Sequence, residues 1–183
     1  MRLPMSLRKL LGKDEKFFDL LEASAEEAKT SAALLAHYLE TADDPARRPD
    51  LDEFVLSRRK DKRIVSHITE ELCRTFVTPL EREDIEALAR ALFRIPKGVE
   101  KVVGRMAIYR GTIPPGHLNR QVALIVEAVD AVGFMVGQLR HGTRLGKIQD
   151  ANARLQQAEG EADKVMVEFI KELYNGPWEG KEF

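Results

Sequence analysis

Two carboxylates near the end of the chain have the spacing of a metal-binding pair. Glu159 and Asp163 are four residues apart in a stretch with helical periodicity, so their side chains share one helix face. They extend an apolar row through Met166 and Ile170, and carboxylates that point into a bundle need a cation, a basic partner or water. Oxygen ligands suit hard cations. The pair predicts a divalent-metal site or, alternatively, a solvated or salt-bridged acidic edge.

Basic residues form a second candidate site. Arg58 and Lys62 are one helical turn apart, and Arg94 and Lys97 lie in the next expected helix. Because Arg58 and Lys62 continue an apolar row of their own helix, they can face inward. The four residues predict a site for an anion or an acidic partner, and the alternative is a solvated helix face. Nucleic acid is not expected, because no aromatic residues interleave with the basic run at 58–63 and the net charge is −1.

Catalytic constellations are missing from the sequence. No histidine follows a glutamate by three residues, as di-iron four-helix proteins require, and the four histidines do not have zinc-site spacing. Gly133 and Gly137 lie within an expected helix, where they are predicted to allow close helix approach rather than to bind phosphate. Cys73, the single cysteine, is expected in the core and fits a reducing cytoplasm. We therefore expect a non-enzymatic cytoplasmic protein with no cofactor other than a possible divalent metal.

The elements that must position these residues are helices. Apolar residues recur at steps of three and four along most of the 183 residues, which predicts an all-α fold. We expect five helices, over residues 14–40, 51–76, 78–106, 118–140 and 144–174. Gly142 suits the left-handed position of a tight turn between the last two. The most apolar segment, 122–139, contains Glu127 and Asp130 and is predicted to be a buried bundle helix rather than a membrane span.

The junction between the second and third helices carries a cap signature. Thr78 is suited to the N-cap, Pro79 to the first helical position, and Glu81 completes a capping box. The sequence therefore predicts that the third helix begins at Thr78.

The same junction also carries a family resemblance. Residues 14–20 read DEKFFDL, residues 75–85 read TFVTPLEREDI, and residues 158–163 read AEGEAD. These stretches follow one another as in PhoU-like proteins, and the chain resembles that family over residues 13 to 183. The branch that it resembles comprises phosphate transport regulators, or accessory proteins of Pit-type phosphate transporters.

The resemblance implies an elongated PhoU-like bundle and a function. Residues 1–183 would form a single domain, with a three-helix half at 12–110 and a second half at 117–183 that lacks its last helix. The implied role is a cytoplasmic regulator or accessory of inorganic phosphate transport. It would act by protein–protein interaction with a Pit-type transporter and touch the membrane only through it.

The resemblance also identifies where metal would be held. Acidic pairs between helices collect iron or other metals in PhoU-like proteins, but the corresponding positions here include Arg58, Lys62 and Lys97. We therefore expect no divalent metal between the second and third helices. Two alternatives to the transport role are a metal-binding helical protein that uses Glu159 and Asp163, and a structural oligomerisation module.

The missing last helix leads to a prediction about assembly. Without that helix, an apolar strip on the fourth and fifth helices should be exposed and covered by a second copy or a partner's helix. The strip would comprise Val122, Val129, Val136, Met166 and Ile170. This predicts a homo-oligomer.

Overall fold

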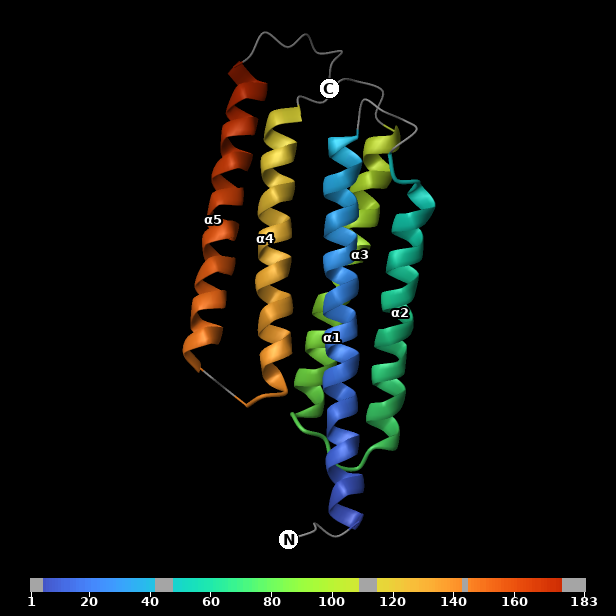
Figure 1. Cartoon of the computed structure of the whole chain (residues 1–183). Coiled ribbons are helices and arrows are strands. Elements are labelled where there is room, and N and C mark those ends of the chain that lie inside the picture. The colour runs from blue at the N-terminus through green and yellow to red at the C-terminus, as the bar shows by residue number, and fades with distance from the viewer. Residues whose placement is uncertain (1–4, 42–47, 109–114, 143–144, 176–183) are drawn as a thin grey trace.

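The computed structural model describes residues 5–41, 48–108, 115–142 and 145–175, and all the regular structure in these ranges is helical. The elements are α1 (Met5–Glu40), α2 (Leu51–Arg74), α3 (Arg82–Ile108), α4 (Pro115–Leu139) and α5 (Leu145–Asn175). Figure 1 shows α5, α4, α1 and α2 side by side, with α3 behind them. The predicted all-α bundle is thus confirmed, although α1 begins earlier than the expected position 14.

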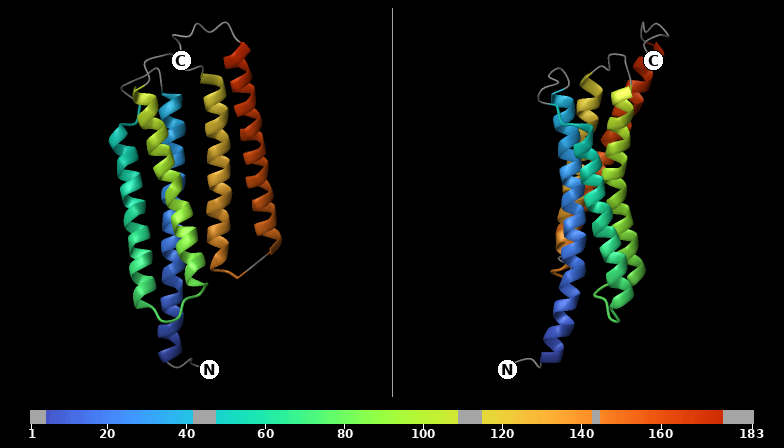
Figure 2. Two further views of the ribbon diagram at one scale, coloured as in Figure 1. Left: turned by 180° about the vertical axis from the view of Figure 1, so that it is seen from behind. Right: turned by 90° about the vertical axis from the view of Figure 1, so that its right-hand side faces the viewer.

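α1 is the central helix of the bundle. It packs against α2, α3 and α4, while α2 also packs against α3 and α5 packs against α4. Arg140 fastens the end of α4 to α1, because its Nε donates to Glu22 Oε1 at 2.8 Å and its guanidinium also pairs with Asp19. Hydrogen bonds to Glu22 and Asp19 raise the pKa of Arg140 above its ordinary value. The row of helices seen in Figure 2 follows from these contacts.

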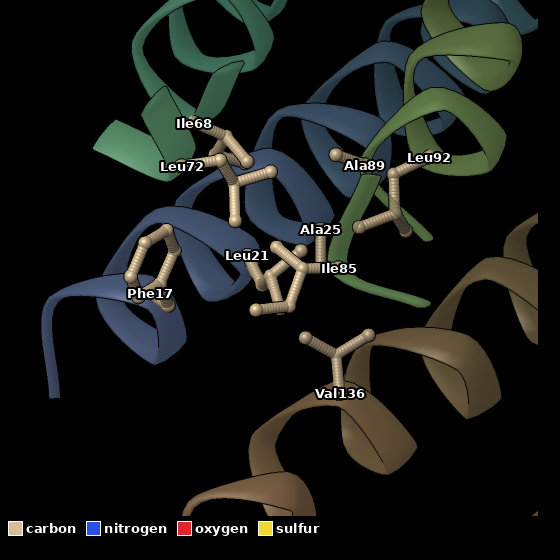
Figure 3. Packing of buried hydrophobic residues seen from close by; sticks show 9 residues of the cluster. All are labelled: Phe17, Leu21, Ala25, Ile68, Leu72, Ile85, Ala89, Leu92 and Val136. Carbon is tan, nitrogen blue, oxygen red and sulfur yellow. The ribbon is translucent and has the colours of Figure 1, made fainter. Parts of the chain in front are cut away.

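The largest cluster of buried residues joins α1, α2, α3 and α4. Phe17 and Leu21 of α1 are 1% and 0% exposed. The cluster, shown in Figure 3, contains Phe17, Leu21, Ala25, Ile68, Leu72, Ile85, Ala89, Leu92 and Val136. Its members come from four helices because each helix presents one apolar row to the bundle axis. Burial of this cluster, together with the two clusters that contain Ala28, Ala32, Leu35 and Tyr38, holds α1 between its neighbours.

The exposed face of α4 is not the face that was predicted. Val122, Val129 and Val136 are buried against α1 and α3, so the expected exposed strip is wrong for these three residues. Met166 and Ile170 of α5 are 50% and 42% exposed, as expected. The strip was misplaced because the predicted row faces α1 instead of a missing helix.

The segment Leu118–Leu139 of α4 is long and apolar enough, by length and composition alone, to cross a membrane. The core helix of a soluble bundle passes the same test. In the structure this segment packs between α1 and α5, as predicted for a bundle helix, but only 22% of its most apolar window is buried, so the prediction that it is buried is wrong for most of its residues. Gly133 lies in contact with the aliphatic part of Lys29 on α1, which fits the predicted close approach, whereas space beside Gly137 is open.

The junction between α2 and α3 is built differently from the prediction. α3 begins at Arg82, and the Thr78 hydroxyl donates a hydrogen bond to the Leu80 carbonyl at 2.8 Å, so the predicted capping box is wrong. The first amides of α3 are bonded by the Glu81 carbonyl, which accepts from Asp84 N at 3.1 Å. A true capping box occurs instead at Asp50 and Glu53, at the start of α2.

Arg82 caps the preceding helix from across the junction. Its guanidinium donates to the Leu72 carbonyl at 2.5 Å, to the Phe76 carbonyl at 3.1 Å and to the Thr75 carbonyl. The last carbonyls of a helix have no partner within it, and a cation there also interacts favourably with the helix dipole. Arg82 therefore joins the end of α2 to the start of α3.

Replacing Arg82 with alanine should lower the free energy of unfolding by about 1–2 kcal/mol, because three carbonyl contacts to a charged group are lost. Thr78→Ala, the matched control in the same junction, should cost less, since its hydroxyl makes one short-range bond. Urea unfolding of the two variants measures the difference. A larger loss for Thr78→Ala would contradict this account of the junction.

Candidate interaction surface

Glu159 and Asp163 lie on the exposed part of α5. Ala158 and Val165 are the buried residues of this region, whereas both carboxylates and the following Met166 are exposed. The prediction that the row of Glu159 and Asp163 leads toward the core is wrong, because α5 meets α4 through the row that contains Ala158 and Val165. In the described part of the chain, no group of three or more His, Cys, Asp or Glu side chains could hold a metal ion. A metal at this pair stays a prediction.

The predicted basic site is divided between α2 and α3. Arg58 is half-buried and pairs with Glu100 of α3, while Lys62 is exposed. The apolar row that Arg58 and Lys62 were predicted to continue comprises Val65, Leu72 and Phe76, of which Leu72 is buried and Phe76 is 96% exposed. The idea that this row faces inward is therefore wrong for Lys62. α2 instead buries Phe54, Ser57, Asp61, Ile68 and Leu72.

α3 carries a row of cations along its exposed side. We name this row the cationic crest; it consists of Arg94, Lys97, Lys101 and Arg105, all exposed. The residues follow at steps of three and four, so they share the face opposite the buried Leu92. The Lys97 ammonium lies 5.9 Å from the centre of the Phe93 ring. Lys101 and Arg105 were not among the predicted site residues, although the same spacing could have identified them.

Between α3 and α4 the surface is hollow. This apolar valley has a volume of about 370 Å³ and is lined by Leu88, Ala91, Leu92, Ile95, Val132, Met135, Val136 and Leu139. Within the described ranges the backbones of α3 and α4 do not approach each other closely; both helices pack on α1, and only their side chains meet in the core clusters. Viewed from behind in Figure 2 (left), α3, α4 and α5 follow one another across the molecule.

The two edges of α5 carry different residues. On one edge, Glu161 pairs with Arg120 of α4 at 3.2 Å, and Asp150 and Arg154 lie near Phe134. Arg120 and Phe134 are on the side of α4 that faces away from the valley-lining residues, so this edge of α5 is the far one.

The other edge therefore lies on the valley side. It carries Glu159, Asp163, Met166 and Ile170, which follow at steps of four and three. Phe134 lies near Asp150 and Arg120 pairs with Glu161, so Glu159 and Asp163 stand beside the Arg120 half of α4 and not beside the valley-lining residues 132–139.

Asp61 is buried between α2 and α1, which sequence reasoning missed. It is 0% exposed; Ser24 Oγ donates to its Oδ1 at 2.6 Å, while Oδ2 has no hydrogen-bond partner. Beside it, Ser57 Oγ donates to Glu27 Oε1 at 3.0 Å. Burial raises the pKa of Asp61 to about 6, the Ser24 hydrogen bond lowers it, and the Glu27 carboxylate raises it. The signal in the sequence was spacing, because Asp61 shares a helix face with Phe54, Ser57 and Ile68, the buried side of α2.

Cys73 is exposed rather than buried, so the prediction of a core cysteine is wrong. The reason is that the buried side of α2 passes through Leu72, and Cys73 points about 100° away from it.

Comparison with known proteins gives distant relatives. No known family profile matches the chain. Over 169 residues the chain is 24% identical to a Rhizobium meliloti (strain 1021) protein named "Putative pit accessory protein", which covers 91% of this chain and 78% of that protein. The chain is similar to a Pit accessory protein. It is also 28% identical over 104 residues to the UPF0111 protein YkaA of Bacillus subtilis (strain 168), across 57% of this chain and 50% of YkaA.

These relatives support the PhoU-like, Pit-accessory resemblance in outline, at low identity. The match to the Pit accessory protein extends over most of this chain, so it includes residues of both the three-helix half and the second half. The match to YkaA spans half of that protein.

Proposed function

We propose that this chain is a non-enzymatic accessory of inorganic phosphate transport, which acts in the cytoplasm by contact with a Pit-type transporter. The observation that carries the proposal is the similarity to a protein named as a Pit accessory, over 91% of this chain. The role of the chain would be to bind the transporter and alter its activity, without a chemical step of its own.

The character of the surface supports binding rather than catalysis. An active site usually combines a hollow with a few convergent polar groups. The valley between α3 and α4 is lined by apolar residues alone. Such a lining suits the apolar centre of a protein–protein interface.

Capture from membranes tests the proposal. The tagged chain and the Pit-type transporter encoded in the same genome would be co-expressed, solubilised in mild detergent and captured through the tag. We expect the transporter to co-elute, whereas an unrelated transporter of similar size, expressed in the same way, should not. Phosphate uptake by cells that lack the chain should differ from that of cells that contain it. Absence of co-elution together with unchanged uptake would refute the proposed function.

A further inference from the structure

We propose that the outer face of α2 and α3 binds the surface of an anionic phospholipid membrane directly, with the two helices lying flat on the headgroups. We name this surface the basic face; it consists of Arg59, Lys62 and Arg63 of α2 together with the cationic crest of α3, and all of these side chains are exposed. The proposal rests on the proposed function for one point only, namely that the chain works at a membrane. It goes beyond the expectation that the chain touches the membrane only through a transporter.

The two helices turn these cations to a common side. On α2, Asp61 faces α1 through its hydrogen bond from Ser24, and Arg58 faces α3 through its ion pair with Glu100. Residues of a helix follow one another at about 100°, so the three α2 cations of the basic face point past α3 and away from the bundle. On α3 the crest lies opposite the buried Leu92. Because α2 and α3 pack side by side, as Figure 2 (right) shows, the two sets of cations form one surface.

Acidic neighbours do not neutralise the basic face. Residues 55–66 of α2 contain one acid, Asp61, which is buried, and residues 93–105 of α3 contain one, Glu100, which pairs with Arg58. Within the described part of the chain, none of the seven cations of the basic face forms an ion pair. Since the whole chain has a net charge of −1, its other residues are acidic in balance. A charge distribution of this kind turns the basic face toward an anionic surface.

The cations diverge, which fits an extended anionic surface rather than one small anion. A small anion is held by donors that converge on it, whereas these side chains project outward from two convex helices. The crest runs from Arg94 to Arg105, which is about 17 Å along a helix axis. α2 adds a second row at the usual separation of packed helices, about 8–10 Å. Membrane headgroups present phosphates over such an area, and clusters of Lys and Arg on helices are attracted to them.

A docked protein fits the basic face less well. The centre of a protein–protein interface is apolar and depleted of lysine. Two large hydrophobic residues of the same segments are exposed, Leu56 and Val102. Val102 follows the valley residue Ile95 by seven positions and so lies on the valley side of α3, and Leu56 precedes the first cation of the α2 row. Neither is at the centre of the basic face, whose charged character suits adsorption on headgroups.

Sedimentation with vesicles tests the proposal. The purified full chain is mixed with vesicles of phosphatidylcholine alone, or of phosphatidylcholine with about one third phosphatidylglycerol, and we expect at least about tenfold tighter binding to the second. Binding should fall steeply at about 0.5 M NaCl, because salt screens the attraction. Inorganic phosphate should compete no better than chloride at the same ionic strength. Specific competition by phosphate would assign the basic face to the free anion and overturn the membrane inference.

Two variants locate the contact on the protein. Lys97→Glu/Lys101→Glu should weaken binding to the anionic vesicles at least about tenfold, since each cation near an anionic surface contributes roughly fivefold. Lys147→Glu/Arg154→Glu makes the same change of charge at exposed positions of α5 and should weaken binding less than about threefold. Circular dichroism melts would verify that each variant is folded.

Lysine acetylation, followed by mass spectrometry, gives the orientation on the vesicle. Lys97 and Lys101 should react more slowly with the reagent when anionic vesicles are present, whereas Lys147 should react at the same rate with and without them. Slower reaction of Lys147 alone would show that the chain adsorbs through α5.

Equal binding to the two kinds of vesicle, or equal effects of the two double variants, would overturn the inference. Tighter binding to a duplex oligonucleotide or to an acidic peptide than to the anionic vesicles, at the same salt concentration, would assign the basic face to that class of partner instead. No transporter is present in this assay. Vesicle binding without transporter capture would therefore retain the membrane contact and reject the Pit-type partner, and capture without vesicle binding would do the reverse.

Discussion

Replacing Asp61 with asparagine is expected to make the protein more stable above pH 6 and to remove a pH dependence that the native protein shows. The pKa of Asp61 rises from 3.8 to about 6 on folding, chiefly because the carboxyl is buried. Between these values the folded state binds more protons than the unfolded state, so the free energy of unfolding falls as the pH rises. The full loss, reached above about pH 6, amounts to about 3 kcal/mol.

Asparagine keeps an acceptor for the Ser24 hydroxyl, which bonds Asp61 Oδ1 at 2.6 Å, and carries no charge to bury. The stabilities of the native protein and of Asp61→Asn would be measured by urea unfolding at intervals from pH 4 to pH 8. The advantage of the variant should be small at pH 4 and should grow until the pH passes about 6. A difference that does not change with pH would show that Asp61 is not protonated more readily in the folded state.

The second large effect is expected at the centre of the main cluster. Leu21→Ala should lower the free energy of unfolding by about 3 kcal/mol, because the leucine is 0% exposed and its removal leaves a cavity among Phe17, Ile68 and Ile85. The loss should appear as a lower urea midpoint with an unchanged slope.

Leu56→Ala provides the matched control for the cavity. Leu56 is 49% exposed on α2, so the same change of side chain there removes much less buried contact and should cost under about 1 kcal/mol. Equal losses at positions 21 and 56 would mean that α1 does not hold its place through this cluster.

The sequence by itself determined the helices and most of their inner faces. Steps of three and four predicted five helices, and all five are present within the described ranges, with the stripe through Phe17 and Leu21 on α1 buried. Gly142 has the left-handed φ of 61° that the tight turn required. These features are local: they depend on residues within two turns of one another, and their physical causes act in any tertiary context.

The site residues could be predicted only in part. Arg94, Lys97, Glu159 and Asp163 were identified by charge and spacing, and all four are exposed. Their positions relative to one another could not be predicted, because α3 and α5 are far apart in the sequence and are placed only by packing, α3 on α1 and α2, and α5 on α4.

Only the tertiary structure decided which polar groups are inside and which apolar groups are outside. Asp61 is buried because Ser24 of α1 supplies a hydrogen bond from 37 positions away in the sequence, and Arg82 caps α2 across a turn that brings it back to Leu72. Helical periodicity shows which residues share a face, but the neighbour that a face meets is set by how the helices pack. For that reason the apolar valley between α3 and α4 belongs to the fold and not to any single helix.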